Sequence, residues 1–508
     1  MTDWIGYRWL AEARGVEPVQ PFPIDSQIGR SRSTVREDGF THERYLAAAR
    51  PDDTLAGHLT FALRHEGVHL EFLRRLFAVI APSELVDWIT AEPTGQYARR
   101  ACFLYEWLTA QALDFPGVTA GNYVNALDPE EYLTATDPVN YPRWRIRDNL
   151  PGVRDYCPMV RRTPRVKAAE AYDCAQGLQQ LEQDFGVDLL MRSAVWLTVK
   201  ESRASFAIER EEQHADRVQR FAAVMERRCG TWAAPLLPDH LTELQTDILG
   251  PRATRYGIRQ SPVFVGEDGY APVIHYIAPH WDDTPAMLAG LQAFDAKTRG
   301  QSPIVRAAAI SFGFVYIHPM ADGNGRISRF LVNDVLRRDG AVSAPFILPV
   351  SATIISTATT RRSYDQVLEV LSRPLMATYG TAYRFGHRQI GADGVEYNLE
   401  FDAYADANSA WRYPDLTAHS EYLGDVVRAT IEQEIRSEAG ILRSLRAARE
   451  AVKNVLEGPD RDIDRIIRSV RESGGQISGK LRREFPVLAD NTLAAAVVQA
   501  IGDVFADE

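Results

Sequence analysis

The chain has 508 residues, of which 45% are apolar and 25% charged, a composition typical of a globular protein with about two to four domains. Its net charge of -11 and pI near 5.6 give no whole-chain attraction to nucleic acid or to an anionic membrane. The N-terminus lacks the apolar run of a signal peptide, no segment is long enough to span a membrane, and the cysteines lack metal-type spacing, so we expect a reduced cytoplasmic protein.

The N-terminal region contains helix-like apolar runs, among them residues 55–81. Within that run His65, Glu66 and His69 fit the pattern H-E-x-x-H, in which two histidines one helical turn apart bind zinc and the glutamate activates water. His58 lies on the same side, but no third ligand stands at the usual downstream spacing. A zinc metallopeptidase is therefore kept as an alternative, beside histidines that simply pack on a helix.

A charged helix is expected over residues 196–215. Ser205 and Glu209 are four positions apart and so lie one turn apart on that helix. Taken alone, the pair fits an ordinary solvent-facing helix surface.

A β-hairpin is predicted between this helix and the middle of the chain. Two apolar runs, 258–266 and 271–279, flank a turn that contains Asp268 and Gly269. Asp-Gly between apolar runs is typical of a hairpin, although these residues alone fit any surface hairpin.

A buried helix is predicted from Ile304 to Ile317, because apolar residues recur there at helical intervals. His318 then lies at the C-terminal end of this helix, because Pro319 prevents the helix from continuing. An imidazole with an ordinary pKa near 6.5 can accept a proton from a hydroxyl at neutral pH, which makes His318 a candidate general base.

The loop after His318 has the residue types of a phosphate site. Glycines allow the backbone N–H groups to turn inward as an anion-binding nest, and a helix predicted from about Gly325 points its positive end at the same place. Arg326 and Arg329 share one face of that helix and can bind two phosphates. Asp322 supplies a carboxylate that would hold Mg²⁺ with several waters.

The stretch from His318 to Arg329 resembles the signature of the Fic family, H-P-F-x-[DE]-G-N-G-R-x-x-R. Most members of that family transfer AMP from ATP to a hydroxyl of a target protein. All specified positions match except Met320, which stands in place of Phe. Methionine is a flexible hydrophobe, so we expect a slightly looser loop.

The resemblance implies a role for each matching position. His318 would deprotonate the target hydroxyl, and Asp322 would hold a magnesium ion bridging the α- and β-phosphates. Gly325 stands where the kinase-like Doc branch has Lys, which implies attack at the α-phosphorus with pyrophosphate leaving. The resemblance assigns the phosphates of ATP to Gly323, Asn324, Gly325, Arg326 and Arg329.

Ser205 and Glu209 resemble the inhibitory helix of the same family, [ST]-x-x-x-E-[GN], with Arg210 as the departure. Glu209 is then implied to pair with Arg329 and to take the space of the γ-phosphate. Removing Glu209 is expected to activate the enzyme. Removal of AMP from targets, with Glu209 orienting water, is an alternative that the sequence leaves open.

The hairpin, at about 258–279, resembles the family's flap, which lies over the nucleotide and pairs with an extended segment of the target. His275 and Tyr276 on its second strand are assigned to nucleotide binding by this resemblance. Tyr364 belongs to a segment similar to R-x-x-Y-Y-x-x-L and is implied to line the adenine pocket.

The expected fold is mainly α. A helical accessory domain is predicted at 1–190, a Fic-type core with inhibitory helix and flap at 191–380, and a hairpin plus helical domain at 381–508. The expected activity is AMP transfer from Mg-ATP to Ser, Thr or Tyr of target proteins and of the chain itself. No membrane or nucleic-acid partner is expected, and a homodimer is left open.

Overall fold

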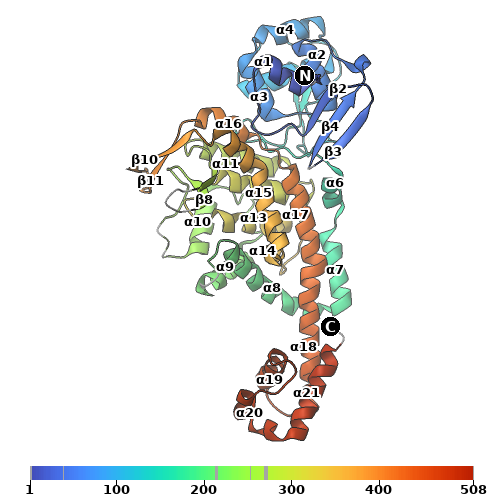
Figure 1. The fold of residues 1–508 in the computed structure, drawn as a ribbon. Helices are drawn as coiled ribbons and strands as arrows, with labels where there is room; N and C mark the ends of the chain where they lie inside the picture. Colours follow the sequence, from blue (N-terminus) through green and yellow to red (C-terminus); the bar gives the residue numbers. More distant parts are fainter. Residues whose placement is uncertain are drawn as a thin grey trace.

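The computed structural model describes residues 3–37, 39–211, 215–251, 253, 255–267 and 273–506. Helices dominate this part of the chain, and the strands form small, separate sheets (Figure 1). The predicted mainly α fold class is confirmed. Three clusters of buried apolar side chains occupy the interior, and each draws mainly on a different stretch of sequence.

The first cluster is built largely from residues 7–159 and contains buried rings such as Phe72 and Trp144. Its helices are α1 (Tyr7–Arg14), η1 (Ala47–Ala49), α2 (Leu55–His65), α3 (Leu70–Val79), α4 (Pro82–Ala91) and α5 (Gln96–Thr109). Two small sheets, which the apolar pattern did not predict, accompany them. One has the order β1-β2-β4-β3 and the other β5-β7-β6, with bounds β1 (Trp4–Ile5), β2 (Ile24–Ile28), β3 (Ser33–Glu37), β4 (Phe40–Tyr45), β5 (Val124–Asn125), β6 (Val139–Tyr141) and β7 (Ile146–Asp148).

The H-E-x-x-H segment does not lie on one helix. Helix α2 ends at His65, Glu66 is its C-terminal cap, and His69 is the N-terminal cap of α3. Gly67 between them has φ +88°, a left-handed backbone that ends the helix. The Nδ1 atom of His69 accepts the main-chain N–H of Phe72. The prediction of one helix carrying both histidines is wrong, and the zinc alternative loses the geometry it needs.

Glu66 is buried instead, and it accepts the main-chain N–H of Tyr7 at 2.8 Å. Burial raises the pKa of its carboxyl to about 8. The folded state therefore holds a proton that the unfolded state releases near pH 4.5, so this group's contribution to stability is lost as pH rises from about 4.5 through 8.

Glu66→Gln keeps a neutral acceptor, so we expect a higher melting temperature than wild type at pH 8.5 and a smaller difference at pH 5, measured by circular dichroism.

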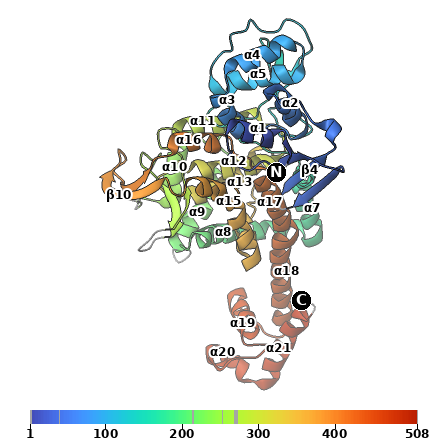
Figure 2. The same ribbon diagram turned by 45° about the horizontal axis from the view of Figure 1, so that its top comes forward.

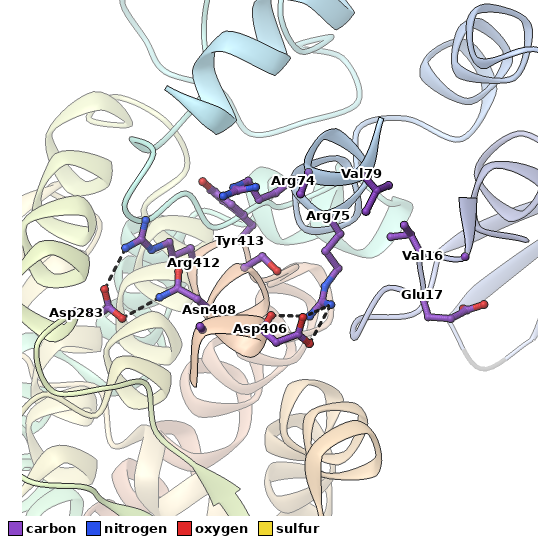
Figure 3. Close-up of a pocket in the computed structure, with 14 residues that line it drawn as sticks. Val16, Glu17, Arg74, Arg75, Val79, Asp283, Asp406, Asn408, Arg412 and Tyr413 are labelled. Atoms are coloured by element: carbon purple, nitrogen blue, oxygen red, sulfur yellow. Dashed lines mark hydrogen bonds and ion pairs between the residues drawn. The ribbon is translucent and has the colours of Figure 1, made fainter. Parts of the chain in front are cut away.

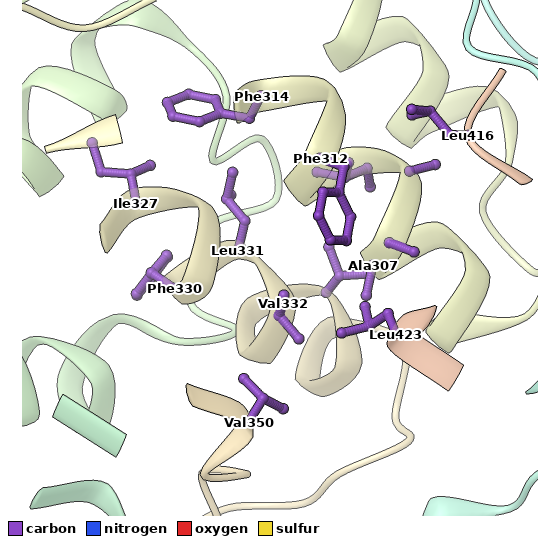
Figure 4. Close-up of a cluster of buried hydrophobic side chains, with 14 of the residues drawn as sticks. Ala307, Phe312, Phe314, Ile327, Phe330, Leu331, Val332, Val350, Leu416 and Leu423 are labelled. Carbon is purple, nitrogen blue, oxygen red and sulfur yellow. The ribbon is translucent and has the colours of Figure 1, made fainter. Parts of the chain in front are cut away.

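The second cluster surrounds α12 (Pro303–Ile317), which is apolar on all sides and buried along nearly its whole length. Helix α13 (Asn324–Arg338) packs against it, and both helices contribute side chains to this cluster, among them Phe312 and Leu331 (Figure 4). The predicted bounds of α12 and the predicted start of α13 are confirmed to within one residue. The other elements before residue 380 are α6 (Pro164–Ala171), α7 (Cys174–Phe185), α8 (Val187–Ile208), α9 (Ala215–Arg228), α10 (Pro238–Leu249), β8 (Phe264–Glu267), β9 (Val273–Ile277), α11 (Thr284–Lys297), α14 (Val350–Ile355) and α15 (Ala358–Tyr379).

The chain returns to this central cluster after residue 380. Helix α17 (Thr417–Ala429) packs along α12, with the ring of His419 at 4.8 Å from that of Phe312. Buried residues of the cluster continue to Ala439, so it draws on both sides of the predicted boundary at 380. The other elements here are the predicted hairpin β10 (Tyr383–Ile390) and β11 (Glu396–Phe401), then α16 (Tyr404–Arg412) and the π-helical turn η2 (Thr430–Ile435).

The third cluster belongs to the tail of the chain. Helix α18 (Arg436–Lys453) carries the chain away from the central cluster to a small helical bundle (Figures 1 and 2). The bundle consists of α19 (Asp460–Glu472), α20 (Gly479–Glu484), η3 (Pro486–Ala489) and α21 (Asn491–Phe505). Among the helices that the structure describes, none has both the length and the apolar character needed to cross a membrane.

The first and second clusters meet at a cavity of about 680 Å³ (Figure 3). Arg75 of α3 contacts Asp406 of α16, with Nη1 at 3.3 Å from the carboxylate. Asp283 accepts from Asn408 at 2.8 Å and pairs with Arg412 at 3.1 Å. The ion pair of Arg75 with Asp406 therefore joins the two regions at this cavity, and no candidate site residue lines it.

Candidate active site

His318 is the C-terminal cap of α12, in a left-handed conformation with φ +49°. Its main-chain N–H donates to Phe314 at 2.9 Å, and its Nδ1 lies 3.2 Å from the main-chain oxygen of Val315. Nδ1 therefore carries the hydrogen, which leaves Nε2 with its lone pair. Burial and the nearby Arg259 guanidinium lower the pKa of His318 to about 4, so the imidazole is neutral at physiological pH.

The loop after His318 is fixed by the side chain of Asn324. Its Oδ1 accepts the main-chain N–H of Met320 at 2.9 Å, and its Nδ2 donates to the Met320 oxygen at 2.9 Å. Met320 is fully buried, and its backbone bridges to Ile258. Gly323, the N-terminal cap of α13, has φ +82°. Both polar atoms of the Asn324 side chain are bonded to Met320, so only the main-chain N–H of Asn324 is left to bind phosphate as predicted.

Arg326 and Arg329 stand on the first turns of α13, both almost fully buried. Both pair with Glu209, the C-terminal cap of α8: Arg329 Nη2 lies 2.5 Å from Oε1, and Arg326 Nε lies 2.9 Å from Oε2. Arg329 Nε also donates to the Ser205 hydroxyl at 2.6 Å. The structure thus brings the predicted inhibitory pair together with both predicted phosphate-binding arginines. The predicted helix over 196–215 is wrong at its end, because α8 stops at Ile208 and the chain turns left-handed at Arg210.

The Glu209 carboxylate sits directly on the start of α13. A Cβ atom added to Gly325 would lie only 2.2 Å from Glu209 Oε1. The helix N-terminus and two guanidiniums attract an anion to this spot, and a carboxylate occupies it here. A side chain at position 325 would therefore displace the Glu209 carboxylate from this place.

A second acid, Glu211, was not identified from the sequence. Its Oε2 lies 3.4 Å from Arg326 Nη1, and its main-chain N–H donates to Phe206 at 2.9 Å. The chain reaches this position through Arg210, whose φ of +60° is left-handed. Gly or Asn adopts that conformation more readily than Arg, which explains the family pattern at this position.

Asp322 is the most exposed member of the cluster, with 58% of its side chain accessible. Its Oδ1 accepts the main-chain N–H of Gly323 at 2.5 Å and lies 3.3 Å from Arg326 Nη2. No group of three or more His, Cys, Asp or Glu side chains gathers as a metal site in the ranges that the structure describes. A lone carboxylate fits Mg²⁺ only where phosphates and water complete the shell, which is the arrangement that Mg²⁺ prefers.

The predicted hairpin is present as β8 and β9, which pair antiparallel with a register shift after Val265. The Asp-Gly turn predicted at its tip lies outside the described residues. His275 is exposed on β9, but the side chain of Tyr276 points into the core, where its hydroxyl donates to the main-chain oxygen of Tyr316 at 2.5 Å. In this conformation Tyr276 is not available to a nucleotide.

Tyr364 on α15 is buried beside the same cluster. Its ring lies 5.8 Å from the Arg361 guanidinium. Burial raises the pKa of its phenol, and the Arg329 guanidinium acts in the opposite direction. Tyr364 therefore neighbours the arginine and glutamate cluster in this conformation.

Part of this site lies in a segment that matches known proteins. The sequence model of the Fic/DOC family matches residues 235–336. This part of the chain is a Fic domain. Protein adenylyltransferase fic-1 of Caenorhabditis briggsae is 37% identical over 94 residues, which is 18% of this chain and 17% of that protein. A Fido domain-containing protein of Dictyostelium discoideum is 37% identical over 92 residues, which is 18% of this chain and 62% of that protein.

The chain therefore spans less than a fifth of the length of the nematode relative. Among solved structures, a Fic family protein from Desulfovibrio desulfuricans has a TM-score of 0.39 at 20% identity, covering 58% of this chain and 82% of that one. A Fic domain containing signaling protein from Bacteroides thetaiotaomicron has a TM-score of 0.35 at 18% identity, covering 53% and 98%.

The matched Fic domain contains the hairpin, α12, the loop and most of α13. It therefore includes His318, Asp322, Arg326 and Arg329. Ser205 and Glu209 lie before it and Tyr364 lies after it. The placement of those outer residues rests on the contacts in this structure alone.

Proposed function

We propose that this Fic domain transfers AMP from ATP to a hydroxyl group of a protein. The observation that carries the proposal is a neutral imidazole at the end of α12 beside an anion site at the start of α13. The charge on Glu209, which occupies that site, also acts on the pKa of His318. A general base and a polyphosphate site thus lie close enough to serve one reaction.

In the proposed reaction, the hydroxyl oxygen of the target attacks the α-phosphorus while His318 Nε2 accepts its proton. The bond between the α-phosphorus and the bridging oxygen breaks, and pyrophosphate leaves. The N-terminus of α13 and the two arginines stabilise the charge on the β- and γ-phosphates. The arginines and the N-terminus of α13 form no covalent bond with the substrate, and they act by positioning the triphosphate.

Asp322 would hold a magnesium ion. When bound, the ion neutralises phosphate charge and orients the leaving group. The exposure of the Asp322 side chain and its loose contact with Arg326 support this assignment, because the carboxylate can turn toward a ligand without breaking a buried pair.

We further propose that Glu209 holds the enzyme in a resting state. Its carboxylate neutralises both Arg326 and Arg329, and the arginines cannot bind it and a full set of phosphates together. The buried Ser205 hydroxyl fixes Arg329 from the same helix. ATP would then bind poorly, or in a pose with the α-phosphorus away from His318.

The target would dock as an extended segment on the hairpin, because Val265 and Val273 are exposed apolar residues on its strands. Self-modification is part of this proposal. All four cysteines are buried and free, which supports a reducing compartment such as the cytoplasm.

Mass spectrometry of the full chain carrying Glu209→Gly tests the reaction type. After incubation with Mg-ATP we expect a mass gain of one AMP on the protein, because the proposed reaction is attack at the α-phosphorus. A gain of one phosphate would replace the proposal with a kinase. Loss of AMP from a pre-labelled target, without any gain, would replace it with a hydrolase.

A further inference from the structure

Arg259 lies just before the hairpin and is 1% exposed. Its guanidinium donates to main-chain oxygens: Nε to His318 at 2.7 Å, Nη1 to Ser261 at 3.1 Å, and Nη2 to Pro279 at 2.6 Å. Nη2 also lies 3.4 Å from the oxygen of Ile317. Across the residues that the structure describes, no carboxylate forms an ion pair with it.

A buried guanidinium that is satisfied only by carbonyl groups is uncommon, because burial disfavours the charge. Burial lowers the pKa of Arg259 to about 10, while Tyr276, Tyr404 and Asp393 act in the opposite direction. The group nevertheless stays charged at neutral pH. Its planar fork reaches several carbonyl oxygens at fixed angles, which the single ammonium of lysine cannot do.

The carbonyl groups come from three separate segments. Ile317 and His318 end α12, Pro279 follows β9, and Ser261 precedes β8. The main-chain N–H of Arg259 also donates to the oxygen of Pro319 at 2.9 Å. The Arg259 side chain therefore bonds the segments before and after the hairpin and the C-terminal end of α12.

His318 depends on this contact for its orientation. Its left-handed backbone, φ +49°, is disfavoured for any residue with a Cβ atom and persists only where neighbours hold it. The Arg259 bond to the His318 oxygen fixes the direction of that peptide group. We propose that Arg259 is a positioning residue for this reaction: it sets the orientation of His318 and couples the imidazole to the hairpin on which the target docks.

The same contact has an electrostatic effect. Two charged groups act on the His318 ring: Arg259, before the hairpin, disfavours the imidazolium, and Glu209, at the end of α8, favours it. Burial is the largest cause of the lowered pKa of the ring, and the positive charge of Arg259 lowers it further. The inference rests on the proposed function for its catalytic consequence, but the effect on the ring exists without any reaction.

The test uses the full-length protein with Arg259→Met and Arg259→Lys, each in the Glu209→Gly background. The titration of His318 is followed by NMR of histidine-labelled protein without nucleotide, and AMP transfer is followed with labelled ATP. In Arg259→Met we expect His318 to titrate at a higher pH, toward its ordinary value. We also expect kcat to fall by about 100-fold, the loss typical of a misplaced catalytic group, with KM for ATP changed less than about threefold.

Arg259→Lys separates charge from geometry. It keeps a positive charge but bonds fewer carbonyl groups, so His318 should titrate as in the parent while kcat still falls. Arg255→Met is the matched control: this exposed arginine also donates to main-chain oxygens, those of Asp393 and Gly394, and its loss should change neither readout.

Thermal unfolding is measured for each variant, and if Arg259→Met does not fold, Arg259→Lys alone decides the positioning role. Unchanged kcat in a folded variant would overturn the proposal, as would a loss confined to KM. An unchanged His318 titration in a folded Arg259→Met would overturn the electrostatic part. If the parent protein transferred no AMP, the titration would still report on Arg259, so failure of this inference is distinct from failure of the proposed function.

Discussion

His318→Ala is expected to lower the rate of AMP transfer by about 10²- to 10⁴-fold, the range that a positioned general base contributes. ATP should still bind, because the anion site is built from α13, Arg326 and Arg329 and not from the imidazole. Initial rates with α-labelled ATP, measured in the Glu209→Gly background, give the loss of transfer. Calorimetry gives the affinity for ATP.

His240→Ala is the control for this experiment. This histidine belongs to the same Fic domain, but its ring stacks on Trp232 at 4.9 Å and its Nδ1 lies 2.8 Å from the main-chain oxygen of Ala234, away from His318 and the two arginines. Its loss should leave transfer unchanged. If His318→Ala lost affinity for ATP by the same factor as it lost rate, the imidazole would be a binding group and the assignment as base would fail.

The pH dependence follows from the pKa of His318, which is lowered to about 4. The base form is fully present above that value, so kcat/KM should stay level from about pH 7 down to about pH 5 and fall only as pH approaches 4. A histidine with an ordinary pKa near 6.5 would already lose most of its base form at pH 5.5.

The central helices were predictable from the sequence because strong local signals agree there. A continuous apolar run ends at His318-Pro319, and glycines mark the start of the next helix, so both ends of α12 and the start of α13 were predicted to within one residue. The loop between them is held by Asn324, a local contact four residues long. Where contacts between residues close in sequence determine the structure, the sequence is sufficient to predict the position of a helix.

The H-E-x-x-H segment shows the opposite case. Its apolar spacing fits one helix, but Gly67 turns left-handed, and a Cβ atom there would lie 2.1 Å from the hydroxyl oxygen of Tyr132. Tyr132 also accepts the main-chain N–H of Val68 at 2.9 Å. A partner 64 residues away ends the helix, and no local pattern reports it.

Glu211 and Arg259 were missed for the same reason. Glu211 stands two residues after Glu209 and meets Arg326 only because Arg210 reverses the chain. Arg259 sits in a segment read as the first strand of a hairpin, where an arginine is expected to face solvent. Both depend on contacts between segments that are 59 or more residues apart.

Glu209→Gly is expected to raise the rate of AMP transfer by about 5- to 150-fold, corresponding to a coupling free energy of roughly 1–3 kcal/mol between the helix end and the nucleotide site. The change removes the carboxylate that pairs with Arg326 and Arg329, so both guanidiniums become available to phosphate. Transfer is measured with α-labelled ATP at concentrations below and above KM. Glu226→Gly, on the exposed side of α9, introduces the same residue away from the site and should change nothing.

Variants of the two residues that follow Glu209 should change the rate of AMP transfer by different amounts. Glu211→Gln should raise the rate less than Glu209→Gly does, because of the two arginines that Glu209 pairs with, Glu211 contacts Arg326 alone, at the longer distance of 3.4 Å. Arg210→Gly should act in the opposite direction and lower basal transfer, since it relieves a left-handed residue at the helix end and stabilises the closed arrangement by about 1 kcal/mol. Equal rates for Glu209→Gly and wild type would remove the inhibitory assignment, and the role of His318 would then stand on the alanine variant alone.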